Sequence, residues 1–196
     1  MSMFRQTALA VALGLTSMVA TAAPLVQNPG FESGSGGDAS NWTESDSDAQ
    51  RSTAAKKTGD YGMRFKKEES ASIEQGGVSG LTSGSKYTIS FWLKGGDNDS
   101  DSYFRVFWDD VKVWEKTGSS ADIPVADWTQ FSVDVDAAGA TGKLKFSSKL
   151  DDEVKDFYLD DVTLTAKSGD VPLPATLPLL GLGFLGLGLA RRKLAA

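Results

Sequence analysis

Short runs in which every second residue is apolar constrain the fold of this chain more than any other feature. In segment 86–94 the apolar positions are Tyr87, Ile89, Phe91 and Leu93. Successive side chains of a strand point to opposite faces, so this period indicates a strand with one buried face. Clusters of Gly, Asp, Ser and Asn separate the runs, and none of them has a clear helical period.

Eight segments between residues 61 and 165 carry this strand pattern. They are 61–66, 70–75, 86–94, 102–108, 111–116, 129–135, 143–148 and 156–165. We expect one or two further strands in 25–50. The predicted fold class is all-β: an antiparallel β-sandwich of the jelly-roll type over residues 25–166.

Two residue types are missing from the 196 residues, histidine and cysteine. Their absence excludes Ser-His-Asp and Cys-His catalysis, His/Cys zinc sites, iron–sulfur clusters and disulfides. The formal net charge is -6, from 20 Lys+Arg and 26 Asp+Glu, which argues against a nucleic-acid partner. No pair of acidic residues is placed by a glycosidase-like motif, so we predict a protein that is not an enzyme.

The N-terminal segment has the features of a secretory signal peptide. Arg5 precedes an apolar run from 8 to 20, and the run ends in the small-residue sequence Ala20-Thr21-Ala22. These features predict a signal peptide over 1–22 and export of the chain.

The C-terminal segment, 171–196, follows a short linker at 167–170. It begins with Val171-Pro172-Leu173-Pro174, continues with an apolar stretch at 177–190, and then carries Arg191-Arg192-Lys193. Counted from Val171 to Ala190, the stretch has the length of a marginal transmembrane helix. The basic cluster is expected on the cytoplasmic side, which leaves the domain outside the inner membrane.

This order of parts resembles the PEP-CTERM sorting signal of Gram-negative bacteria, although the Glu of Pro-Glu-Pro is absent. The resemblance implies cleavage near the proline motif by an exosortase-type membrane protease. The precursor is then anchored in the inner membrane, and the mature protein passes to the cell surface or the extracellular exopolysaccharide matrix. The alternative is a plain C-terminal membrane anchor.

Two strand segments carry aromatic side chains on the face opposite their apolar positions. These side chains are Trp92 in 86–94 and Tyr103 and Phe107, with Arg105 between them, in 102–108. Aromatic rings beside hydrogen-bonding groups suit a sugar, which presents CH groups to a ring and hydroxyls to its neighbours. We therefore predict Trp92, Tyr103, Arg105 and Phe107 as a polysaccharide-binding face. The alternative is that the rings form a satellite cluster under a loop.

Four stretches in order resemble the carbohydrate-binding modules of families 4, 9 and 22, within the galactose-binding-like jelly rolls. They are Leu-Val-Gln-Asn-Pro-Gly-Phe-Glu at 25–32, Thr-Gly-Asp-Tyr-Gly-Met at 58–63, Tyr-Thr-Ile-Ser-Phe-Trp-Leu-Lys at 87–94, and Phe-Tyr-Leu-Asp-Asp-Val-Thr-Leu at 157–164. The resemblance implies a jelly roll with a polysaccharide partner. A structural or adhesive biofilm-matrix protein without a sugar site is the alternative, and a polysaccharide-active enzyme is a more distant one.

These modules commonly hold a structural Ca²⁺ between the first and last strands, which here implies Glu32 together with Asp160 or Asp161. Strand parity places Asp160 on the side of Val162 and Leu164, pointing inward, and a buried carboxylate needs a partner or a metal. We therefore favour Asp160 over Asp161. The alternative is that Glu32 and Asp160 accept hydrogen bonds from turn amides.

Overall fold

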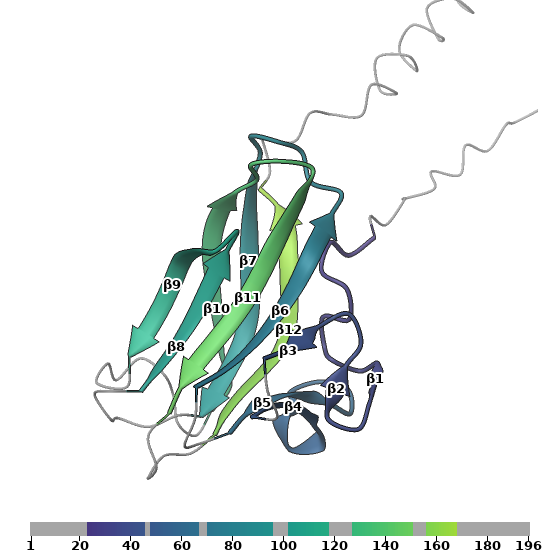
Figure 1. Cartoon of the computed structure of the whole chain (residues 1–196), viewed down its shortest axis with the longest axis vertical. Helices are drawn as coiled ribbons and strands as arrows, with labels where there is room; N and C mark the ends of the chain where they lie inside the picture. The colour runs from purple at the N-terminus through teal and green to yellow at the C-terminus, as the bar shows by residue number, and fades with distance from the viewer. Residues whose placement is uncertain are drawn as a thin grey trace, which may run out of the picture.

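The structure, a computed structural model, describes residues 23–45, 48–66, 70–95, 102–117, 127–150 and 156–167. Two five-stranded antiparallel sheets pack face to face as a β-sandwich (Figure 1). The first, here called the β7 sheet, has the order β10 (Thr129–Asp136), β7 (Lys86–Gly95), β12 (Phe157–Ala166), β5 (Gly62–Phe65) and β4 (Ala49–Ser52). The second, the β8 sheet, has the order β3 (Thr43–Glu44), β6 (Ser70–Ser79), β11 (Thr141–Lys149), β8 (Tyr103–Trp108) and β9 (Val111–Thr117).

The predicted all-β sandwich and its eight strand segments are confirmed. The region before residue 50 is more divided than expected: it adds β1 (Gly34–Ser35), β2 (Asp38–Ala39), β3 and the start of β4. Asn28, Phe31 and Asn41 have positive φ angles that turn the chain between these short pieces. A single 3₁₀ turn, η1 (Thr53–Ala55), follows β4.

Strand β6 is longer than the apolar pattern indicated, because its pairing continues to Ser79. The pattern ends at Gly76 and Gly77, which have no side chain to bury. The backbone of β6 nevertheless pairs with β11 beyond this point, across a register shift between Gly142 and Leu144. Backbone pairing therefore extends the strand where the side-chain signal stops.

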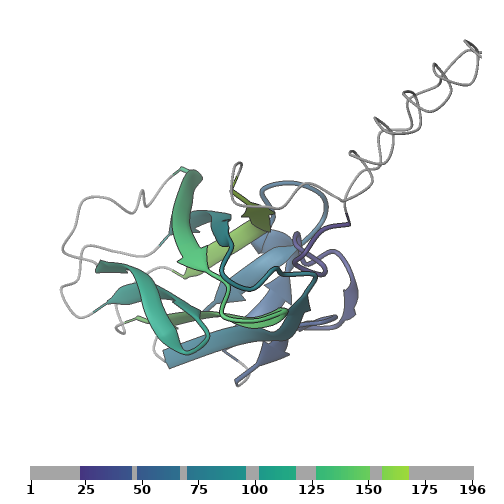
Figure 2. The same ribbon diagram turned by 90° about the horizontal axis from the view of Figure 1, so that it is seen from above.

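Aromatic side chains join the two sheets across the core. Phe91 of β7 lies 6.5 Å from Phe104 of β8 and 5.3 Å from Phe146 of β11, between ring centroids. Between the edge strands β9 and β10, Trp114 packs edge-on against Phe91, and its ring centroid lies 5.0 Å from that of Phe131. Figure 2 shows the two sheets from above. The inner faces are thus fixed by ring contacts, and alternate residues must point to solvent on opposite sides.

Gly142 of β11 leaves room for the side chain of Trp108 of β8. A Cβ atom at Gly142 would lie 2.4 Å from the ring of Trp108, so the indole packs directly on the β11 backbone. The indole nitrogen of Trp108 also donates a hydrogen bond of 3.0 Å to the carbonyl of Asp136, in the other sheet. The ring contact holds the end of β8 against β11, and the hydrogen bond joins it to β10 of the other sheet.

The predicted signal peptide at 1–22 and the C-terminal segment at 171–196 lie outside the described residues. Across the ranges that the structure covers, no helix has the length and apolarity needed to cross a bilayer.

Candidate functional site

The predicted sugar face divides between the two sheets. Trp92 lies on β7, whereas Tyr103, Arg105 and Phe107 lie on β8. Their inward neighbours face each other across the core, so Trp92 and the three β8 residues point away from opposite sides of the sandwich. The expectation of one common face is wrong, because alternation shows which residues of a strand share a face but not which sheet the strand joins.

The three β8 residues form a partly exposed surface together with their neighbours on adjacent strands. Strand register places Lys145, Ser147 and Lys149 of β11 opposite Phe107, Arg105 and Tyr103, respectively. We call this surface the β8 outer face. It consists of the outward residues Ser70, Ser72 and Glu74 of β6, Lys143, Lys145, Ser147 and Lys149 of β11, Tyr103, Arg105 and Phe107 of β8, and Lys112, Glu115 and Thr117 of β9.

The outward row of β11 can be recognised in the sequence. Polar residues at 143, 145, 147 and 149 alternate with the buried residues Leu144, Phe146 and Ser148. This pattern indicates a polar outward face. Only the observed pairing of β11 with β8 shows that the two polar rows lie side by side.

Arg105 is held in place by two neighbours on the β8 outer face. Its Nε and a terminal nitrogen lie 2.9 and 2.8 Å from Oε1 of Glu115, and its guanidinium lies 3.5 Å above the ring of Tyr103. Lys112 binds the other oxygen of Glu115. The hydrogen bonds from Lys112 and Arg105 lower the pKa of Glu115, which therefore stays ionised and keeps Arg105 fixed.

The ring of Tyr103 is thus covered on one side, whereas no ring or cation contact is found at Phe107 in the described part of the chain. Phe107 is flanked by Lys145 on β11 and Lys112 on β9. It is the aromatic side chain of this face best placed to stack on a sugar ring.

Trp92 belongs to a different environment on the β7 sheet. The ammonium of Lys57 lies 3.9 Å from the centroid of its ring and 3.5 Å from Oδ2 of Asp161. The indole therefore serves as a platform for a lysine of the turn at 57–61, which is a structural contact.

That turn is held by the carboxylate of Asp160. Its Oδ2 accepts hydrogen bonds from the backbone N–H groups of Lys57 and Thr58, at 2.7 and 3.0 Å, and its Oδ1 accepts one from Asp161 at 2.7 Å. Asp160 is 0% exposed. Burial raises the pKa of Asp160, and the three N–H donors act in the opposite direction.

Asp160 is buried as expected, but the parity argument for its burial is wrong. Asp160 pairs with Trp92, on the outward side of β12, and a bulge between Asp160 and Thr163 shifts the alternation before Val162. Asp161, with a φ of 51°, is the extra residue. The turn at 57–61 covers the carboxylate from outside, so Asp160 is buried beneath a turn and not in the core.

Glu32 binds the far end of the same turn. Its Oε1 accepts hydrogen bonds from the N–H groups of Asp60 and Tyr61, at 3.1 and 3.2 Å. A Cβ atom at Gly59, where φ is 61°, would lie 2.1 Å from this oxygen. The glycine therefore permits both the turn and the close approach of the carboxylate.

The contacts of Glu32, Asp160 and Asp161 match hydrogen bonding better than Ca²⁺ coordination. Their oxygens receive backbone N–H groups, the hydroxyl of Thr58 and the ammonium of Lys57, all of which are electropositive. Calcium needs a shell of oxygens, and among the described residues no three acidic side chains gather as a metal site. This donor set corresponds to the turn-amide alternative; calcium binding itself stays a prediction.

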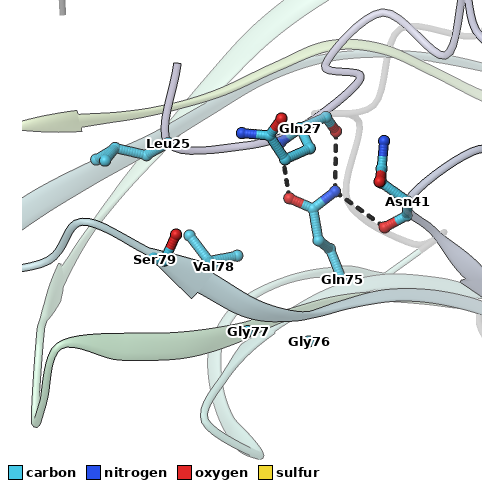
Figure 3. Close-up of a pocket in the computed structure, with 8 residues that line it drawn as sticks. All are labelled: Leu25, Gln27, Asn41, Gln75, Gly76, Gly77, Val78 and Ser79. Atoms are coloured by element: carbon cyan, nitrogen blue, oxygen red, sulfur yellow. Dashed lines mark hydrogen bonds between the residues drawn. The ribbon is translucent and has the colours of Figure 1, made fainter. Parts of the chain in front are cut away.

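A shallow pocket of about 300 Å³ lies between the N-terminal segment and β6 (Figure 3). The amide of Gln75 closes its inner end: the oxygen accepts from the N–H of Gln27, and the nitrogen donates to the carbonyls of Gln27 and Asn41. Both ends of this buried amide are used within the protein. The hydrogen bonds of Gln75 therefore attach the N-terminal segment to β6.

Comparison with known proteins identifies the C-terminal segment and the fold. Residues 170–193 match the PEP-CTERM protein-sorting motif, which confirms the motif predicted around Val171–Pro174 and Arg191–Lys193. A search of curated proteins gives no match for the chain.

Several solved structures share the sandwich. The carbohydrate-binding module TmCBM61, solved with β-1,4-galactotriose, is 20% identical with a TM-score of 0.50, over 74% of this chain and 100% of its own. The CBM22-1 xylan-binding domain of Paenibacillus barcinonensis Xyn10C is 12% identical with a TM-score of 0.51, over 74% and 94%. The K1 cleaved adhesin domain of Lys-gingipain from Porphyromonas gingivalis is 15% identical with a TM-score of 0.54, over 71% and 96%. At these identities the likeness shows a common fold.

Proposed function

We propose that this chain is an exported, non-catalytic carbohydrate-binding protein that acts at the cell surface or in the extracellular polysaccharide matrix. Its ligand surface is the β8 outer face, with Phe107 as the stacking residue and Arg105, Ser147 and Ser72 as hydrogen-bonding neighbours. The observation that carries the proposal is this placement of a partly exposed aromatic ring among hydrogen-bonding side chains of three adjacent strands.

The sorting motif at 170–193 supports export and processing. An exosortase-type protease cuts the membrane-anchored precursor near Pro172 and Pro174, and the mature protein is released from the inner membrane. Mass spectrometry of protein recovered from the cell surface should then find chains that lack Arg191–Lys193. An intact tail on that surface protein would contradict processing and favour a plain anchor.

A second candidate function is that of an adhesive matrix protein with the same fold and no sugar site. The covering of Tyr103 by Arg105 and of Trp92 by Lys57 favours it, because two of the three rings predicted for the sugar face already carry a cation. The two functions differ in whether Phe107 binds a polymer.

Affinity electrophoresis of the full chain in neutral detergent, against a panel of soluble polysaccharides, separates them. We expect at least one polymer to retard the protein, and Phe107→Ala to abolish most of the retardation. Trp92→Phe, on the opposite face, is the matched control and should leave it unchanged. Retardation by none of the polymers, or equal retardation of the wild type and the Phe107→Ala variant, would exclude the proposed face.

A further inference from the structure

The β8 outer face carries more cations than carboxylates, although the chain as a whole is acidic with a formal net charge of -6. Its cations are Arg105 on β8, Lys112 on β9 and Lys143, Lys145 and Lys149 on β11. Among the described residues its carboxylates are Glu74 and Glu115, with Asp109 and Asp110 at the adjoining hairpin. Positive charge is therefore concentrated on this face and is not spread evenly over the domain.

Ion pairs on this face engage three of its five cations among the residues that the structure describes. Glu115 is shared by Arg105 and Lys112, and Lys143 pairs with Asp110 at 2.6 Å. Among the residues that the structure describes, Lys145 and Lys149 make no ion pair, even though Glu74 is the cross-strand neighbour of Lys145. The charge of Glu74 instead helps to raise the pKa of Lys143.

The outer face of the β7 sheet has a different charge arrangement. There Lys86 pairs with Asp136, Lys167 with Asp134, and Arg64 with Asp156. Most cations of that face thus have a carboxylate of their own. The surplus of the β8 outer face is therefore a property of one side of the sandwich.

The unpaired lysines border the proposed stacking site. Lys145 is opposite Phe107, and Lys149 is two outward positions further along β11, with Ser147 between them opposite Arg105. Alternate residues of a strand are about 6.6 Å apart, so Lys145 and Lys149 place two positive charges along the direction of β11. A polymer lying along β11 would place one sugar on Phe107 and its acidic groups within reach of both ammonium groups.

We propose that the ligand of the β8 outer face is an acidic polysaccharide, whose carboxylate groups bind Lys145 and Lys149 while a sugar ring stacks on Phe107. This inference rests on the proposed function and adds the chemical class of the polymer. A neutral polymer would leave both ammonium groups without a partner, whereas an acidic one neutralises them. Nucleic acid is less suited, because Arg105, whose guanidinium could bind a phosphate through two N–H groups, is engaged by Glu115.

The test compares polygalacturonate with neutral galactan and duplex DNA, by affinity electrophoresis of the full chain at low and high salt. The variants are Lys145→Gln/Lys149→Gln and, as the matched control on the opposite face, Lys86→Gln/Lys167→Gln. We expect the strongest retardation by polygalacturonate, a loss of most of it at high salt, and about fivefold weaker binding in the first double variant alone.

The contrary outcomes separate the two proposals. Equal binding of galactan and polygalacturonate, lost in Phe107→Ala but unchanged in Lys145→Gln/Lys149→Gln, would overturn the acidic ligand and keep the carbohydrate-binding function. Binding of DNA as strong as that of polygalacturonate would show a general polyanion surface and overturn the inference. Binding of none of these three polymers would overturn the acidic ligand, and binding of no polysaccharide in the larger panel would overturn both proposals.

Discussion

Asp160 shows how one buried carboxylate organises a turn. It accepts three backbone N–H groups, two of them from residues about a hundred positions earlier in the chain. An acceptor removed from such a site leaves buried donors without partners, which costs about 1–3 kcal/mol. The residue therefore joins the last strand to the turn at 57–61.

We predict that Asp160→Ala lowers the free energy of unfolding by about 1–3 kcal/mol, because the N–H groups of Lys57 and Thr58 lose their acceptor. Urea denaturation measures the difference. Asp161→Ala is the comparison, since Asp161 is partly exposed and accepts hydrogen bonds from side chains. This variant should lower the free energy of unfolding by less. Equal stability of Asp160→Ala and the wild type would contradict the assignment.

The raised pKa of Asp160 also predicts a pH dependence of stability. The folded chain holds the proton of Asp160 more tightly than the unfolded chain does. The protonated carboxyl therefore contributes fully to the free energy of unfolding below the ordinary carboxyl pKa, and this contribution falls as pH rises through the raised pKa. Asp160→Asn, which has no proton to lose, should show a flatter stability profile over that range. Parallel profiles for the two proteins, measured by urea denaturation at a series of pH values, would argue against it.

At the scale of strands, apolar alternation predicted the element types and the inward residues of β7 and β8. It could not predict three features that depend on pairing: the sheet to which β8 belongs, the bulge after Asp160, and the extension of β6 through Gly76. Each is decided by backbone hydrogen bonds between distant segments. Alternation alone therefore places Trp92 and Tyr103 on one face, although the two lie on opposite faces of the sandwich.

The packing of β11 on Trp108 gives a prediction at this scale. Gly142→Ala would place a methyl group 2.4 Å from the indole ring, and overpacking of this kind typically costs about 1–3 kcal/mol. Gly76→Ala in β6 is the control, because a Cβ there meets nothing within 4 Å. Thermal denaturation should show a lower melting temperature for the first variant only; similar melting of both variants would contradict the packing.

The turn at 57–61 makes a prediction about calcium. If N–H groups alone hold the oxygens of Glu32 and Asp160, as in the turn-amide alternative, the melting temperature is the same in excess Ca²⁺ and in chelator. A higher melting temperature in Ca²⁺ alone would mean that the turn rearranges to offer oxygens, as the resemblance to carbohydrate-binding modules implies. Differential scanning fluorimetry under the two conditions distinguishes these results.

At the scale of the whole molecule, the described sandwich lies between two terminal segments that the sequence predicts as a signal peptide and a sorting signal. The composition of 171–196 was sufficient to predict the motif that residues 170–193 match, because such signals are linear and need no fold. The binding face is the opposite case. It is assembled from four strands, so the sequence predicted its β8 residues and not their lysine neighbours on β11.

Hydrogen–deuterium exchange of the full chain, with and without a retarding polymer, tests directly whether a polysaccharide binds on the β8 outer face. We expect slower exchange in peptides that cover Tyr103–Trp108 and Thr141–Lys149, with no change in those that cover Thr129–Asp136 on the other sheet. Protection confined to the β7 sheet, or no protection of β8 and β11 when the polymer is bound, would contradict it.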